Sequence, residues 1–225
     1  MIETEVKKVR GKLKTPRAAA VAGILFALLF GGSLVLIRIS VPASLADTAW
    51  LESNSKKVEL ALNMMPYAGI AFLWFIGVIR DRFGDLEDRL FATVFLGSGL
   101  LFLALTFVGA ALAGGLLNFY SSNATPLVKN DLIIYSRQVM YQILNVYAIR
   151  MEGVFMLSLG TIWWRTGLMH RGLVILTYAS ALMLLLTVNN LSLWVTLVFP
   201  GWVLVISIIV LIQNLRKEPE SLSEV

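Results

Sequence analysis

Cysteine is absent from the 225-residue chain, histidine occurs once, at position 170, and charged residues make up only 15% of the sequence. The first two absences exclude disulfides, thiol chemistry, iron–sulfur clusters, multi-histidine metal sites and bis-histidine haem. A soluble domain would have about 25% charged residues. The shortage of charge therefore excludes an ordinary soluble enzyme, a disordered chain and a nucleic-acid-binding module.

Hydrophobic residues are abundant and make up 58% of the chain. Because a membrane-spanning helix needs about 20 apolar residues, we expect an all-α polytopic membrane protein with six transmembrane helices. The predicted spans cover residues 18–37, 58–79, 90–117, 145–164 (with a helical extension back to 132), 173–188 and 191–212. The expected organisation is a basic cytoplasmic segment at 1–17, a six-helix transmembrane domain at 18–212 and a cytoplasmic tail at 213–225.

The basic residues predict the orientation of these spans. Thirteen lie in the tails and loops of the side that holds the N-terminus, and five lie on the other side. Because Lys and Arg concentrate on the cytoplasmic side, we expect both termini to be cytoplasmic. The spans at 173–188 and 191–212 are separated only by Asn189-Asn190, which predicts a tight antiparallel hairpin.

Residues 1–17 contain six basic side chains with apolar residues at helical spacing between them. This pattern favours an amphipathic helix on anionic lipid, and the alternative is a solvated tail that only enforces the topology. On the outer side, residues 42–53 predict a short surface helix with Trp50 dipping into the membrane.

Two ionisable residues inside the fourth span are the strongest candidates for a functional site. Arg150 and Glu152 are too far apart around a helix to pair with each other, and charges within a span are costly enough to indicate function. Gln138, Asn145 and Glu152 repeat at heptad spacing and Gln142 lies nearby, which predicts one polar stripe.

Other polar residues are predicted at a similar depth or farther outward. Asn63 precedes Pro66 in the second span, Asn189 ends the fifth, and Pro200-Gly201 is expected to break the sixth near mid-membrane. Together with the stripe they predict a polar ligand or ion pocket open to the outer face. The alternative is structural, with Glu152 hydrogen-bonded between helices and Arg150 reaching toward headgroups.

Small residues recur every four positions in two spans, at Ala19, Gly23, Ala27 and Gly31, and at Gly109 and Ala113. Such stripes let helix backbones approach closely. They are expected to pack within the monomer, and a subunit interface is the alternative.

One segment resembles a recurrent stretch of bacterial multi-pass membrane proteins that have no assigned activity. The stretch comprises AGIAFLWFIGVIRDR at 68–82, EDRLFAT at 87–93 and LGSG at 96–99. The resemblance covers about 30 residues and implies a bacterial inner membrane, but it implies nothing about chemistry.

The sequence contains no arrangement of nucleophile and base, no metal-ligand set and no cofactor motif. We therefore expect a non-catalytic integral membrane protein without a cofactor or metal. It would be an accessory, assembly or binding subunit that contacts the lipid bilayer and joins a membrane-protein complex or a homo-oligomer. The alternative is a small channel or secondary transporter that uses Glu152 and Arg150 for an ion or small solute.

Overall fold

The computed structural model describes residues 16–42, 44, 47, 49–83, 89–120, 126–186 and 193–221, and these contain helices and connecting segments but no strand. This confirms the predicted all-α class. The elements in chain order are α2 (Pro16–Ser40), α3 (Trp50–Ser53), α4 (Ser55–Phe83), α5 (Arg89–Tyr120), α6 (Pro126–Gln142), the π-helical segment η2 (Ile143–Ala148), α7 (Ile149–Thr166), α8 (Arg171–Leu186), the 3-10 helix η3 (Leu193–Leu197) and α9 (Val198–Ser221).

Within the described residues, five helical stretches are long and apolar enough to cross a membrane. They are Ala18–Ser40, Ser55–Arg80, Leu90–Tyr120, Asp131–Thr166 and Val195–Ile212. The fifth predicted span corresponds to α8, an apolar helix of 16 residues. At 1.5 Å per residue α8 measures about 24 Å, which is shorter than a hydrocarbon core of about 30 Å. The chain is thus a multi-pass helical membrane protein.

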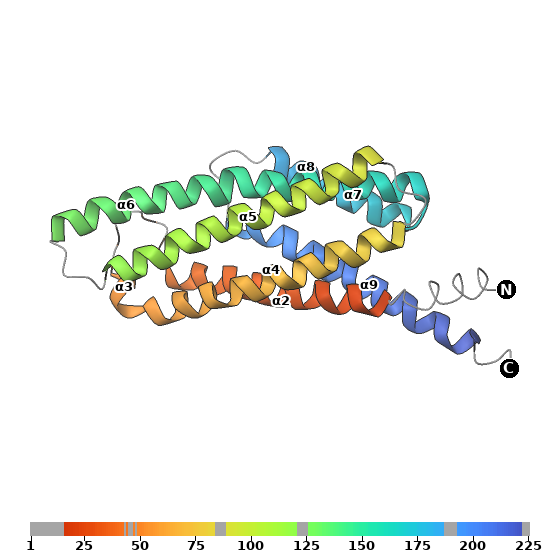
Figure 1. Ribbon diagram of the computed structural model, residues 1–225, viewed down its shortest axis with the longest axis horizontal. Coiled ribbons are helices and arrows are strands. Elements are labelled where there is room, and N and C mark those ends of the chain that lie inside the picture. Colours follow the sequence, from red (N-terminus) through yellow and green to blue (C-terminus); the bar gives the residue numbers. More distant parts are fainter. Residues whose placement is uncertain are drawn as a thin grey trace, which may run out of the picture.

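The helices form two groups, shown in Figure 1 as α2, α4 and α9 below and α5 to α8 above. An aromatic core of Phe26, Phe72, Phe102, Phe155 and Phe199 joins them, with one ring from each of five helices. The Phe26 and Phe72 ring centroids are 4.7 Å apart, and those of Phe102 and Phe199 are 5.1 Å apart. These distances suit favourable tilted and edge-on ring contacts.

The outer faces of the same helices are apolar as well. Exposed side chains include Leu28, Ile70, Leu101, Ile175 and Ile208. Soluble proteins rarely expose large apolar patches to water. In a membrane, lipid tails contact such side chains without an unfavourable free energy.

The predicted tight hairpin of the last two helices is wrong. Most of the packing of α8 is on α7, while α9 packs along α2 and meets α8 over a short stretch. There the Trp202 Nε1–H donates to Thr177 Oγ1 at 2.9 Å. The small residues of α2 provide a closer partner for α9, so a short connection does not oblige α8 and α9 to pair along their lengths.

The predicted surface helix at 42–53 is also wrong. Among the described residues of 42–53, helix is confined to the single turn of α3, and Trp50 is buried against protein instead of dipping into lipid. Trp50, Leu51, Val58, Leu116 and Ile133 form a separate hydrophobic cluster, which we call the outer cluster. A large indole is well buried here because α4, α5 and α6 all extend beyond the aromatic core.

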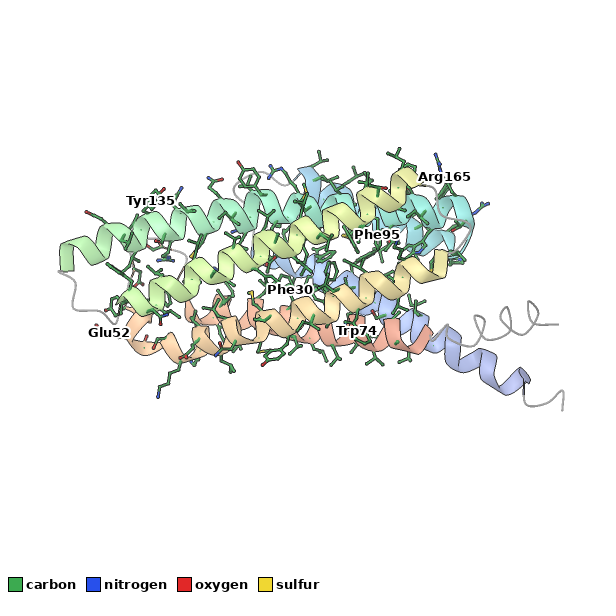
Figure 2. All side chains as sticks on the ribbon, viewed as in Figure 1. Phe30, Glu52, Trp74, Phe95, Tyr135 and Arg165 are labelled. Carbon is green, nitrogen blue, oxygen red and sulfur yellow. The ribbon has the colours of Figure 1, made fainter. Side chains whose placement is uncertain are left out.

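A continuous helical rod runs through α6, η2 and α7, from Pro126 to Thr166. Its length is about 60 Å, roughly twice the hydrocarbon thickness. The rod ends at Gly167, whose φ of 65° lies in the left-handed region that favours glycine. Figure 2 shows Tyr135 and Glu52 at one end of the molecule and Arg165 at the end where α2 begins and α9 finishes.

Candidate functional sites

Glu152 lies inside the bundle. Its side chain is 4% exposed, and its Oε2 atom has no hydrogen-bond partner within the described part of the chain. One turn farther along α7, the Phe155 ring stacks on Phe95 with centroids 4.5 Å apart. The carboxyl group therefore borders the aromatic core, where a polar oxygen without a partner is unfavourable.

The face of α7 that holds Glu152 points toward α9. Leu159 and Trp163 follow at positions i+7 and i+11 on this face, and the Trp163 ring lies 6.0 Å from the Trp202 ring. The two helices run in the same direction (Figure 1). Glu152 precedes Trp163 by eleven residues, which is about 16 Å along the helix.

Arg150 and Asn145 bond to their own helical rod. The Arg150 Nη1–H donates to the Val146 carbonyl at 2.6 Å, and the Asn145 Nδ2–H donates to the Tyr141 carbonyl at 3.3 Å. Both acceptors lie in or beside η2, where i→i+5 bonding displaces carbonyls from their usual donors. These side chains therefore satisfy local backbone groups, and Arg150 is half-buried without reaching Glu152's side of the helix.

The predicted polar stripe does not form. Gln138 and Gln142 are exposed, Asn145 is half-buried and Glu152 is buried, so their environments differ from one turn to the next. Heptad spacing places residues on one face only in a regular α-helix. The six π-helical residues of η2 interrupt that regularity between Gln142 and Glu152.

Asn63, the remaining described residue of the predicted pocket, does not join Glu152. Asn63 is exposed on α4, and Asn189 lies outside the described residues. Pro66 is inside α4 without ending it, and Pro200 lies in the first turn of α9, just after the change from 3-10 to α-helix. Of the five proposed pocket residues that the structure describes, Glu152 alone is buried.

The small residues of α2 lie between α4 and α9. A Cβ atom at Gly23 would overlap the Ser207 hydroxyl and come within 2.8 Å of the Phe75 ring, and one at Gly31 would be 3.8 Å from Pro200. Ala19 and Ala27 are buried in the same helix. In α5, Gly109 receives the Leu144 side chain and Ala113 is buried, so these residues also pack within the monomer.

Arg137, on α6, forms a second polar centre that sequence reasoning missed. It is 8% exposed, and its guanidinium donates to the carbonyls of Pro42, Ser44 and Asp47 at 2.7, 2.8 and 3.0 Å. The guanidinium carbon also lies 5.9 Å from the Trp50 ring centroid. One residue thus fastens α6 to the segment that follows α2.

No sequence signal separated Arg137 from the other basic residues of the outer segments. Its i−4 neighbour, Ile133, is buried in the outer cluster and could have indicated an inward-facing side. The carbonyls that bind Arg137 belong to residues about 90 positions earlier in the chain, and only the tertiary fold brings them close.

Further hydrogen bonds tie the outer cluster together. Tyr120 Oη donates to Glu52 at 3.0 Å, and the Asn54 amide donates to the Ser40 carbonyl at 3.4 Å. The Ser40 hydroxyl and the Trp50 indole N–H are buried without a partner in the described structure. The ends of α2, α3, α4, α5 and α6 are thereby joined into one outer unit.

Apolar side chains are also exposed on the free sides of α6. They include Leu132, Ile134, Tyr135 and Tyr141, and Tyr135 is 68% exposed. Counted along the helix, Tyr135 is about 45 Å from Arg165. If Arg165 marks the inner interface, Tyr135 lies beyond a hydrocarbon core of about 30 Å.

The part of the chain that the structure describes contains no group of three or more acidic or histidine side chains able to hold a metal ion. Comparison of the chain with protein-family models, with curated proteins and with solved structures finds no match. The features of the molecule that bear on function are the two polar centres, at Glu152 and Arg137, and the exposed end of α6.

Proposed function

We propose that this chain is a non-catalytic membrane protein that serves as an assembly or binding subunit in a bacterial inner membrane. In this proposal α8 completes six spans, with the residues that flank it making up the missing length. The proposal places both termini in the cytoplasm, because Arg165 lies at the end of the molecule where α2 begins and α9 finishes (Figure 2), and Arg171 begins α8 shortly after it. The basic segment at 1–17, proposed to bind anionic lipid, lies mostly outside the described residues.

The observation that most supports this function is the apolar surface of α6 beyond the membrane. One side of α6 covers the outer cluster through Ile133, while Ile134 and Tyr135 face away from the molecule at 40% and 68% exposure. Exposed apolar and aromatic side chains in water are typical of protein-binding surfaces. Arg137 and the outer cluster hold α6 in place, so the surface is ordered before a partner binds.

Affinity purification in mild detergent tests this function with a matched pair of variants. Tyr135→Ala removes the exposed ring from α6, whereas Tyr67→Ala removes an equally exposed ring (66%) from α4 at membrane depth. We expect a partner protein to co-purify in stoichiometric amount with the wild type and with Tyr67→Ala. We expect this partner to be lost from Tyr135→Ala. Absence of any stoichiometric partner, or a partner retained by both variants, would contradict the proposal.

The buried carboxyl group of Glu152 favours a second candidate function, transport of an ion or small solute. Ionisable residues at membrane depth commonly belong to transport pathways, and a local change of helix type beside such a residue is a feature of secondary transporters. Arg150 contributes less than expected, since it bonds to Val146. Proteoliposomes with a pH-sensitive dye inside would show a flux that Glu152→Gln abolishes; equal flux with both proteins would exclude this role.

A further inference from the structure

We propose that Glu152 is a proton-binding site, occupied by a proton in the resting protein and housed beside the aromatic core. The proton would be the transported ion of the second candidate function. Only the use of this proton in transport depends on that function. Occupancy itself is argued from the surroundings of the carboxyl group.

Burial of the Glu152 side chain favours the neutral, proton-bound acid. The side chain is almost completely enclosed, Oε2 has no hydrogen-bond donor in the described structure, and Phe155 and Leu159 continue the same face inward. An ionised carboxylate in such a place loses its hydration and gains no replacement. Uptake of a proton from hydronium converts the carboxylate to the neutral acid and releases water, so the buried charge is removed.

The charged and titratable groups nearby are already engaged or lie elsewhere. In α7, Arg150 bonds to the Val146 carbonyl, and in α8, Tyr178 donates to Thr161 Oγ1 at 3.0 Å. Neither α5 between Leu90 and Phe119 nor the chain from Val195 to Ile212 contains an ionisable residue. Groups on the other packed elements are exposed or at helix ends, and they include Tyr147 of η2, Arg38 of α2, and Lys56, Lys57, Glu59, Tyr67 and Arg80 of α4.

The composition of the site favours a proton over a metal cation. Ca²⁺ and Mg²⁺ take about six or more oxygen ligands, several of them from carboxylates. The described residues bring no second acid to Glu152 and form no metal-binding group of acids or histidines. A proton is the one cation that a single carboxyl oxygen can hold by itself.

The backbone around Glu152 provides a second, independent observation. The π-helical turn η2 ends at Ala148, four residues before Glu152. Segments of π-helix inside α-helices occur frequently at functional sites. Here a departure from α-helical bonding lies about one turn from the buried acid.

Infrared spectroscopy of the protein in lipid at neutral pH tests the proposal directly. The wild type should show the carbonyl stretch of a protonated carboxyl group, shifted by D₂O, and Glu152→Gln should lack it. Glu59→Gln, which changes an exposed acid of α4, should retain the band. A wild type without the band, or a band that persists in Glu152→Gln, would overturn the proposal.

Isotope labelling covers the case in which Glu152→Gln fails to fold. Glutamate carrying ¹³C at its side-chain carboxyl should shift the wild-type band, and an unshifted band would assign it elsewhere and overturn the proposal. Flux measurements separate this inference from the transport function. If the band is present but no proton flux is measured, Glu152 binds a proton and the protein is not a proton transporter. If flux depends on Glu152 but the band is absent, transport is supported and a resting proton on Glu152 is excluded.

Discussion

At the scale of single residues, Arg137 and Glu152 show opposite solutions to burying a charged group. The Arg137 guanidinium is surrounded by three carbonyls and an indole ring. Its planar array of donors suits several acceptors at once. Glu152 has no such partners in the described structure. Glu152 is therefore the better candidate for a ligand-binding residue, and Arg137 is the better candidate for a structural anchor.

Replacing Arg137 should loosen the outer unit. A lysine ammonium is a compact donor that cannot reach three carbonyls in the same geometry. We expect Arg137→Lys to lower the free energy of unfolding by about 1–3 kcal/mol, measured by thermal unfolding in detergent. Arg150→Lys is the control and should cost less, since Arg150 donates to one carbonyl of its own helix. Equal losses would contradict the anchoring role.

The contact of Trp202 with Thr177 gives a second prediction. Thr177→Val removes the acceptor and leaves the indole N–H buried without a partner, which should cost about 1–3 kcal/mol of unfolding free energy. Thr177→Ser retains the hydroxyl and should cost less. Similar thermal unfolding of the two variants would show that this bond does not hold α8 to α9.

At the scale of elements, packing and helix type decide which faces meet. Gly23 allows α2 to touch both α4 and α9, while Gly77 on α4 has open space around it. The π-helical turn η2 changes the register of α6 relative to α7. As a result, Ile133 and Arg137 face the outer unit while Glu152 faces the bundle, although a regular helix would have aligned the polar residues.

Alanine substitutions at two glycines test the helix contacts of α2. In Gly23→Ala the new methyl group would meet the fully buried Phe75 ring at 2.8 Å. Such overpacking should cost about 1–3 kcal/mol of unfolding free energy. Gly77→Ala adds the same group where nothing lies within 4 Å, and should be neutral or stabilise by up to about 1 kcal/mol. The comparison is made by thermal unfolding in one detergent, and a reversed order would refute the packing described for α2.

At the scale of the whole molecule, the unequal helix lengths create an outer unit on a membrane bundle. The rod from α6 to α7 is about 60 Å long and α8 about 24 Å, so the rod extends well beyond the length of α8. The surplus length extends on the side away from Arg165. In the proposed function this surplus carries α6 past the lipid and so provides the partner surface.

Single cysteines in the naturally cysteine-free chain test this topology. A membrane-impermeant maleimide should label Tyr135→Cys and Asn189→Cys in intact cells, because both are expected outside. Leu168→Cys, between α7 and α8, should be labelled only after permeabilisation, and the unaltered chain should give no signal. Labelling of Leu168→Cys and Asn189→Cys from the same side would contradict a crossing by α8.

The sequence by itself determined the helical class and the membrane setting, because apolar runs of about 20 residues have no other favourable environment. It also identified Glu152, since an acid inside an apolar run is conspicuous. Tertiary structure alone decided that Arg137 anchors the outer unit, that Trp50 is buried in protein, and that Asn63 and Gln142 lie away from Glu152. Those outcomes depend on contacts between residues distant in the chain and on a local π-helix, and neither leaves a periodic pattern that a sequence can reveal.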